Sequence, residues 1–293
     1  MIRISIDYSM QYGEPMLRQI NENKNVSVVP LLTTGKASNF KSGKASLSIK
    51  GPLKVMSYNI HYGVGRDSVH SVNRIAKVIK ESGADIVGLN EVDNGFSQRS
   101  QFVNQAKLLA DNLNMHHVFG AAISKENYET GYGNVILSRY KPDNIQNYML
   151  PTKEGEESRA CLSAEFSING KKIKFFVTHL HHKDNELRKK QIDSITEIAA
   201  GPIASIITGD FNHAADISQL DTFWAGFKKR FHSAFDLAGT GDAETFYGAE
   251  SKIIDFVFIS NQLAHCVQKS YVLRSKTAQI ASDHLPLIAE IMI

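Results

Sequence analysis

Cysteines and long apolar runs are scarce in this sequence. Its 293 residues include two cysteines, Cys161 and Cys266, which lie far apart and match no metal-binding or redox spacing. We therefore expect buried free thiols at both positions. No apolar run approaches the roughly 18 residues of a membrane span, so we expect no transmembrane segment.

The first residues do not have the pattern of a signal peptide. Residues 1–7 lack the order of basic and then apolar residues that defines one. If Met1 is the natural start, we expect a cytoplasmic protein; if the chain is a processed product, secretion stays open. A hydrophobic content of 42% is ordinary, and the length suffices for one large α/β domain, with or without an appendage. The sequence indicates no oligomeric state.

A strong charge of one sign is also missing. The formal net charge of the whole chain is +3. Residues 1–53 contain seven basic and three acidic residues. The other 240 residues carry 26 basic and 27 acidic side chains. Non-specific binding to nucleic acid normally requires a clearly basic surface, because phosphate contacts dominate that affinity. The body of the chain does not indicate such a surface.

Residues 1–53 differ in composition from the rest of the chain. Isoleucines alternate with polar residues over 2–7, and residues 26–32 form a second strand-like run. Residues 33–50 are rich in Thr, Gly, Ser, Lys and Asn, which is typical of loops or an exposed β-ribbon. We predict a small β-rich N-terminal extension of unknown role. It is either an edge addition to the main domain or a binding or localisation module.

The main domain, residues 54–293, has strands and helices that alternate early, whereas strands dominate late. No period of 20–50 residues repeats, so the pattern favours sheets packed between helices. The predicted helices are 72–81, 101–114, 186–200 and a short one at 222–227. The predicted strands are 54–60, 85–91, 116–120, 133–138, 160–167, 173–180, 203–208, 253–260, 268–273 and 287–293.

Polar side chains stand at the ends of several predicted strands. Asn59 closes the first and Glu91 the second. Each alone is typical of a turn or a solvated charge, but together they offer the hard oxygen ligands that Mg²⁺ prefers. Asp210 and Asn212 follow the strand at 203–208 and share a face, which places a proton acceptor beside an amide. His179, next to another strand end, can donate to a phosphoryl oxygen.

Asp255 lies inside the apolar run 253–260, where an unpaired carboxylate would be costly. The obvious partner is His284, in the segment Ser282-Asp283-His284. A hydrogen bond between them would fix the tautomer of the imidazole and stabilise its charged form. Asp283 would then face metal or water.

Six segments carry a family resemblance. They are Tyr58-Asn59, Leu89-Asn90-Glu91-Val92, Thr178-His179-Leu180, Gly209-Asp210-Phe211-Asn212, Ile254-Asp255-Phe256 and Ser282-Asp283-His284. In order and spacing the chain resembles the endonuclease/exonuclease/phosphatase (DNase I-like) superfamily over about residues 53–293. The resemblance implies a four-layer α/β sandwich, in which two packed mixed β-sheets are flanked by helices and a metal site lies at one edge.

The resemblance also implies a reaction, the hydrolysis of a phosphoester by in-line attack of water. Glu91 and Asn59 would hold Mg²⁺ or Mn²⁺ against a phosphate oxygen. Asp210 would activate the water, and Asn212 would orient Asp210 or the phosphate.

The other implied roles concern the phosphate. His179 and His284 would donate hydrogen bonds to phosphoryl oxygens. Asp255 would hold His284, and Asp283 would tune that histidine or support a second metal. Asn134 is expected near the substrate phosphate, with a strand-edge amide as the alternative.

The substrate stays open between three readings. The near-neutral body favours a phosphodiesterase or phosphatase that acts on a small or lipid-derived phosphoester. The first alternative is a DNase I-like endonuclease acting on DNA or RNA, and the second is an inactive binding module on the same fold. Arg188 and Gln191 share a helix face that either reaches the site or is solvated, and we favour the solvated face. The aromatic run 223–227 is expected in the core.

Overall fold

The computed structural model describes residues 51–124, 130–213, 223–248 and 251–293, together with the backbone of four short strands nearer the N-terminus. These are β1 (Ser5–Ile6), β2 (Leu17–Arg18), β3 (Ser27–Val29) and β4 (Thr33–Gly35). Strand β3 falls within the predicted run 26–32, and β4 begins the segment predicted as loop or β-ribbon. The other residues of the predicted extension before residue 51 lie outside the described ones.

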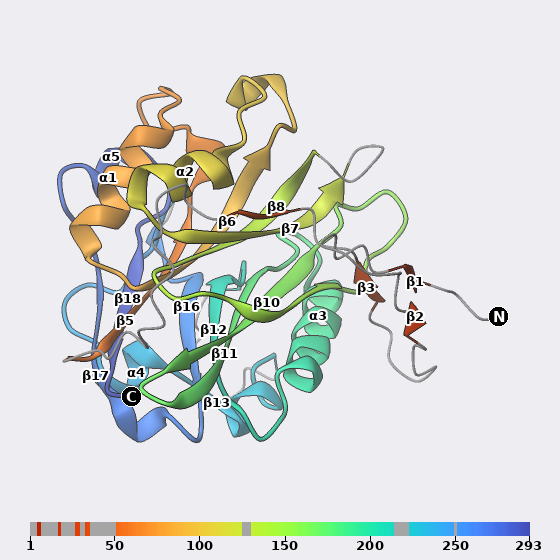
Figure 1. The fold of residues 1–293 in the computed structure, drawn as a ribbon, viewed down its shortest axis with the longest axis vertical. Helices are drawn as coiled ribbons and strands as arrows, with labels where there is room; N and C mark the ends of the chain where they lie inside the picture. The colour runs from red at the N-terminus through yellow and green to blue at the C-terminus, as the bar shows by residue number, and fades with distance from the viewer. Residues whose placement is uncertain are drawn as a thin grey trace.

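Two seven-stranded sheets form the centre of the fold (Figure 1). The first has the order β17-β18-β5-β6-β8-β7-β4, with β5 (Leu53–Asn59), β6 (Ile86–Asn94), β7 (His116–Ser124), β8 (Gly131–Ser138), β17 (Val267–Val272) and β18 (Leu287–Ile291). The second has the order β13-β16-β12-β11-β10-β9-β3, with β9 (Asp143–Met149), β10 (Ala160–Ile168), β11 (Lys171–His179), β12 (Ala204–Asp210), β13 (Phe231–Ser233) and β16 (Asp255–Ser260). A separate hairpin pairs β14 (Phe246–Tyr247) with β15 (Ser251–Lys252).

Each sheet contains one parallel pair of strands among the described pairings, β5 with β6 and β11 with β12. A parallel pair needs a long crossover, and helices α1 (Val72–Ser82) and α3 (Asn185–Ile198) supply the two crossovers. Both helices begin at a side-chain cap, because Ser71 Oγ accepts from Arg74 N and Asp184 Oδ1 accepts from Leu187 N. The carboxyl ends of both parallel pairs lie at the same edge of the sandwich, so the side chains at these strand ends lie close together.

Helices cover the outer faces of the sheets. Helices α1 and α2 (Gln105–Leu113) lie on one side and α3 lies on the other (Figure 1). Two short helices, α4 (Ala234–Ala238) and α5 (Ala278–Ala281), and four 3₁₀ turns complete the described elements: η1 (His61–Gly63), η2 (Gln98–Ser100), η3 (Phe227–Lys229) and η4 (Ala264–Cys266). The predicted four-layer α/β sandwich with two mixed sheets is confirmed.

The sheets pack very closely behind the polar edge. Gly88 of β6 faces Thr208 of β12, and a Cβ at residue 88 would lie 2.1 Å from Thr208 Oγ1. Leu89, Val177 and Ile206 belong to the core between the sheets. Because Thr208 Oγ1 also donates to Phe176 O, the hydroxyl cannot move away freely. Glycine at position 88 thus sets the spacing of the two sheets.

A second, aromatic core lies under α3. Phe211, Trp224, Phe227 and Phe258 pack with ring centroids 4.8 to 6.2 Å apart, and all four are buried. The prediction that the run 223–227 belongs to the core is therefore confirmed. The predicted helix at 222–227 is wrong over the described residues 223–227, which form turns and the start of η3. The aromatic side chains of this segment contact Phe211 and Phe258. These contacts determine the backbone, because they place rings on several sides of the segment.

Several other predictions differ from the structure. Helix α2 begins at residue 105 and not at 101, because Asn104 caps it and Gln101 and Phe102 have left-handed backbone conformations. Strand β9 was not predicted. Arg188 and Gln191 are buried rather than solvated. Arg188 donates to the His181 carbonyl, and Gln191 accepts from the His181 N–H and donates to the Pro151 carbonyl.

The two cysteines differ in burial. Cys161 is a buried free thiol as predicted, whereas the free thiol of Cys266 is only half-buried. Among the described residues, no helix is both long and apolar enough to cross a membrane.

We expect Gly88→Ala to destabilise the protein by about 1–3 kcal/mol, because the new methyl group overlaps Thr208 in a packed interior. Urea unfolding measures the change. Gly201→Ala is the matched control, since a Cβ at that position meets no atom within 4 Å. Equal midpoints for the two variants would contradict the close packing described here.

Candidate active site

The ends of strands from both sheets bring the predicted polar residues together. Asn59 ends β5, His179 ends β11 and Asp210 ends β12. In the second sheet, Asp210 is the register partner of His179 on one side and of Asp255 on the other. Backbone pairing therefore places three predicted site residues side by side.

Asp210 lies at the centre of the cluster. Its Oδ2 accepts from Asn59 Nδ2 at 3.1 Å, and its Oδ1 accepts from the backbone N–H of Asn212 at 2.9 Å. The same Oδ2 lies 3.5 Å from His179 Nε2 and 3.7 Å from His284 Nε2. Burial, reinforced by the Asp255 carboxylate, raises the pKa of Asp210 to about 7, although His284 and the two hydrogen bonds act in the opposite direction.

The predicted hydrogen bond between His284 and Asp255 is present. His284 Nδ1 lies 2.7 Å from Asp255 Oδ2, and both side chains are buried. Burial alone would lower the pKa of His284, but the carboxylates of Asp255, Asp210 and Asp283 together raise it to about 10. The ring is therefore a cation at neutral pH, with Nδ1–H donating to Asp255 and Nε2–H turned toward Asp210.

His179 has a different environment from His284. Its Nδ1 lies 3.0 Å from Nη1 of Arg159, a buried arginine that immediately precedes β10. Burial, the Arg159 guanidinium and the His284 ring hold the pKa of His179 well below its ordinary value. This histidine is neutral.

Glu91 projects from an irregular point in β6. The register of β6 against β8 shifts between Leu89 and Val92, and Glu91 has a φ of +57°. Left-handed backbone is strained for a glutamate, and such strain gathers at functional sites. The half-buried Glu91 carboxylate accepts from Asn59 Nδ2 at 3.1 Å through Oε1.

The amide of Asn59 is turned differently from the expectation for a metal ligand. Its Oδ1 accepts from the backbone N–H of His61 at 3.0 Å, and its Nδ2 donates to both Glu91 and Asp210. The opposite orientation would set an N–H against another N–H and a carbonyl oxygen against two carboxylates. In this arrangement Asn59 links two acidic side chains, and its predicted role beside the metal stays a prediction.

Carboxylates at two places in the cluster are candidate ligands for a metal ion. Ligand atoms of Asp210, Asp255 and His284 lie within 4.8 Å of one another. Asp255 Oδ2 and His284 Nδ1, however, are already bonded to each other. Glu91 fits better, because its carboxylate is half-buried and Mg²⁺ is commonly held by one or two carboxylates together with waters and substrate phosphate.

The remaining predicted residues lie at or near the cluster. Asn212, with a φ of +50°, donates from Nδ2 to Leu180 O at 3.0 Å. Asp283 is one-third exposed and lies 3.8 Å from His61 Nδ1. Asn134 is 1% exposed, accepts from Asn90 and donates to Ala160 O. Both ends of the Asn134 amide are thus bonded inside the protein, and its place near the substrate phosphate stays a prediction.

Two polar residues of the site were not predicted to act there. Asn90 accepts from Asp210 N and donates to Asn134 and to Thr178 O, so it joins the two sheets. Its signal in the sequence was an amide inside an apolar strand, directly before Glu91. Arg159 gave no such signal, because a single arginine before a strand is ordinary in sequence.

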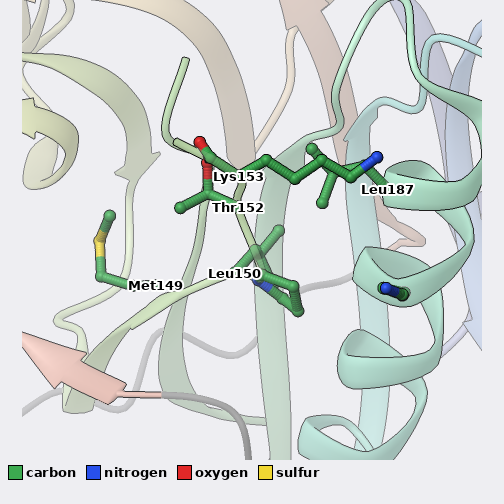
Figure 2. A pocket seen from close by; sticks show the side chains of 7 residues that line it. Met149, Leu150, Thr152, Lys153 and Leu187 are labelled. Carbon is green, nitrogen blue, oxygen red and sulfur yellow. The ribbon is translucent and has the colours of Figure 1, made fainter. Parts of the chain in front are cut away.

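A separate cavity of about 450 Å³ lies between the end of β9 and α3 (Figure 2). Met149, Leu150 and Leu187 form its apolar part, and Lys153 and Lys190 lie along it. Lys153 pairs with Asp184, the cap of α3. None of the predicted site residues lines this cavity.

The fold and the polar edge together define the class of the protein. It is a member of the endonuclease/exonuclease/phosphatase superfamily, whose members are divalent-metal-dependent phosphoester hydrolases, and the predicted membership is confirmed. More narrowly, residues 51–208 match the family described as the PGAP2IP C-terminal nuclease-like domain, and the chain belongs to that family.

Individual relatives are distant. Protein cwh43 of Schizosaccharomyces pombe is 27% identical over 135 residues, which is 45% of this chain and 13% of that protein. The chain therefore matches only a small part of this curated relative.

Solved structures show a likeness of fold. An endonuclease/exonuclease/phosphatase from Beutenbergia cavernae has a TM-score of 0.69 and 22% identity, over 83% of this chain and 72% of that one. A mannosyl-6-phosphatase from Bacteroides thetaiotaomicron has a TM-score of 0.65 and 20% identity, over 82% of this chain and 100% of that one.

We expect Asp255→Asn to lower the pH at which His284 loses its proton, because the strongest opposing charge is removed while burial remains. Titration of the His284 ring signals by NMR measures this change. In the unmodified protein the free energy of unfolding should fall between pH 6.5 and about 10, since native His284 keeps a proton that the unfolded chain has released. In Asp255→Asn this dependence should flatten.

Asp283→Asn is the control for this titration. Asp283 raises the pKa of His284 less than Asp255 or Asp210 does, so its removal should shift the titration less. A titration of His284 that Asp255→Asn leaves unchanged would contradict the assigned pairing.

Proposed function

We propose that this chain hydrolyses a phosphoester by in-line attack of a water molecule that Asp210 activates, with Mg²⁺ or Mn²⁺ as cofactor. The observation that supports the proposal most directly is the position of Asp210. Its Oδ2 lies within 3.5 Å of His179 Nε2 and 3.7 Å of His284 Nε2. One proton acceptor and two hydrogen-bond donors thus meet at one point.

Asp210 is suited to take a proton from water. A general base works best when its pKa lies near the working pH, and the pKa of Asp210 is raised to about 7. Asn59 Nδ2 and the Asn212 N–H hold its two oxygens in fixed directions. The lone pairs that remain are available to the attacking water.

His179 and His284 are suited to bind phosphoryl oxygens. Donors placed in advance around a developing negative charge stabilise it without reorganisation. His284 brings a full positive charge, which Asp255 maintains. His179 brings a neutral ring, so the pair does not add two cations to a buried site.

Glu91 is the residue that we assign to hold the metal ion. A bound divalent ion would supply Lewis-acid stabilisation of a phosphate oxygen. Asn59 would keep the Glu91 and Asp210 carboxylates at a fixed separation, because one amide group donates to both.

The substrate that we favour is a small or lipid-derived phosphoester, cleaved as a diester or monoester. The body of the chain has 26 basic and 27 acidic residues after position 53, which offers little attraction to a polyanion. A mannosyl-6-phosphatase shares the fold. The second candidate is an endonuclease acting on DNA or RNA, because the family is described as nuclease-like. A binding module without activity fits poorly, since the residues proposed as base, hydrogen-bond donors and metal ligand are all present.

We expect Asp210→Asn to lower kcat by about 10²–10⁴-fold, the usual contribution of general acid–base catalysis. The measurement is turnover of bis-p-nitrophenyl phosphate with Mg²⁺ or Mn²⁺, beside sphingomyelin, inositol phosphates, nucleotide phosphoesters, RNA and plasmid DNA. Asp193→Asn is the control, because this carboxylate is exposed on α3 and pairs with Lys189. Equal turnover in Asp210→Asn and the unmodified protein would rule out Asp210 as the base.

The same panel distinguishes the two candidate functions. Plasmid nicking that weakens steeply as salt rises, with no turnover of small phosphoesters, would favour the endonuclease.

We expect chelation by EDTA to abolish turnover and added Mg²⁺ or Mn²⁺ to restore it. Glu91→Gln should raise the metal concentration needed for half-maximal activity, because a neutral amide binds a hard cation more weakly than a carboxylate. Activity that survives chelation would contradict the role of the metal. A metal requirement unchanged in Glu91→Gln would contradict the role of Glu91.

A further inference from the structure

Arg159 is a buried arginine aimed at a catalytic histidine. Its side chain is 4% exposed, and Nη1 lies 3.0 Å from His179 Nδ1. The guanidinium also pairs with Glu157 at 2.9 Å. The backbone at Arg159 is fixed as well, because its carbonyl accepts from Leu150 N at 2.9 Å, next to the pairing of β9 with β10. The arginine is therefore held in place from both the backbone and the side chain.

The chemistry of the two groups determines the direction of this hydrogen bond. A guanidinium keeps its protons at any working pH and has donors but no acceptor. The nitrogen that faces it must therefore offer a lone pair, so His179 Nδ1 carries no proton. A neutral imidazole then has its single proton on Nε2. That nitrogen lies 3.5 Å from Asp210 Oδ2.

His284 shows the opposite arrangement at its own Nδ1. There the neighbour is the carboxylate of Asp255, an acceptor without protons, at 2.7 Å. Nδ1 of His284 must therefore be a donor, and the carboxylate favours the doubly protonated ring. Nε2 of both histidines thus faces Asp210 Oδ2, whereas Nδ1 faces a cation in His179 and an anion in His284.

We propose that Arg159 is a positioning residue that fixes His179 as the neutral tautomer with its proton on Nε2. This inference rests on the proposed function for its consequence in catalysis. His179 can donate to a phosphoryl oxygen through Nε2, but it cannot compete with Asp210 for the proton of the attacking water. The arginine acts through the histidine and need not touch the substrate.

Other charged groups near His179 do not supply this effect. Asp210 on β12 lies on the Nε2 side and cannot select a tautomer through Nδ1. His284, before β18, and His182, in the loop after β11, oppose a positive charge on the ring through space and not through a bond to Nδ1. Glu157 reaches His179 only through Arg159. Among the described residues, the donor bonded to Nδ1 is the Arg159 guanidinium.

The test is NMR of the metal-free protein labelled with ¹⁵N at histidine, in which the two ring nitrogens have distinct shifts when protonated and unprotonated. In the unmodified protein, His179 should show Nε2 protonated and Nδ1 unprotonated at every pH from about 5 to 8. In Arg159→Met the ring should either mix tautomers or take up a second proton within this range. Arg159→Gln should keep the tautomer, because a carboxamide N–H can still donate, but it should allow protonation at a higher pH than the unmodified protein does.

A matched control is available in the same part of the fold. Arg188 is also buried, but its guanidinium donates to the His181 carbonyl and not to His179. Arg188→Met should leave the ring nitrogens of His179 unchanged. An altered His179 in this control would mean that any lost buried cation has the same effect, which would overturn the specific role of Arg159.

Kinetics connect the tautomer to the reaction. Arg159→Met should reduce kcat by about 10- to 100-fold, in line with misplacement of a catalytic group, and Arg159→Gln should recover part of the loss. A loss of activity in Arg159→Met with the His179 tautomer intact would overturn the proposal and indicate direct contact with substrate. If the unmodified protein hydrolyses no phosphoester, the proposed function fails, but the NMR result still decides the role of Arg159. If Arg159→Met does not fold, the spectra of Arg159→Gln decide it.

Discussion

The burial of the Asp210 carboxylate between two sheets is the constraint on which the site depends. A buried charge must be compensated by hydrogen bonds and by opposite charge. Asn59 from β5, the Asn212 backbone and the His284 cation supply that compensation. These groups come from both sheets, so the site exists only when the sandwich has formed. Asn90 strengthens the connection, because one amide bonds the backbone of Asp210 and the backbone of Thr178.

Backbone strain surrounds the same carboxylate. Glu91 and Asn212 both have left-handed φ values, as do His61 and Tyr62 in η1. Asparagine tolerates this conformation well, but glutamate does not, and the bulge in β6 maintains it there. The strain turns Glu91 away from the regular strand direction and beside Asn59. The precise direction of a potential metal ligand is thus obtained at the expense of local stability.

How much could be predicted from sequence follows from the range of the interactions involved. Sheets packed between helices were predictable because apolar runs mark strands, and the four-layer sandwich followed from the family resemblance of six short segments. The pairing of Asp255 with His284 was predictable because a charge inside an apolar strand demands a partner. The amide orientation of Asn59 was not, since it depends on the backbone N–H of His61 in a left-handed turn. The positions of Arg159 and Arg188 depend on contacts between separate segments, since Arg159 contacts His179 and Arg188 contacts His181. Such contacts leave no periodic pattern in the sequence.

The two short strands β3 and β4 have a consequence for the edges of both sheets. Strand β3 pairs with β9 at the edge of one sheet, and β4 pairs with β7 at the corresponding edge of the other. An uncovered edge strand presents free N–H and C=O groups that invite pairing with a second molecule. Residues 27–29 and 33–35 thus each cover an edge strand, one in each sheet. Because the backbone makes this pairing, β7 and β9 offer fewer free N–H and C=O groups to a second molecule.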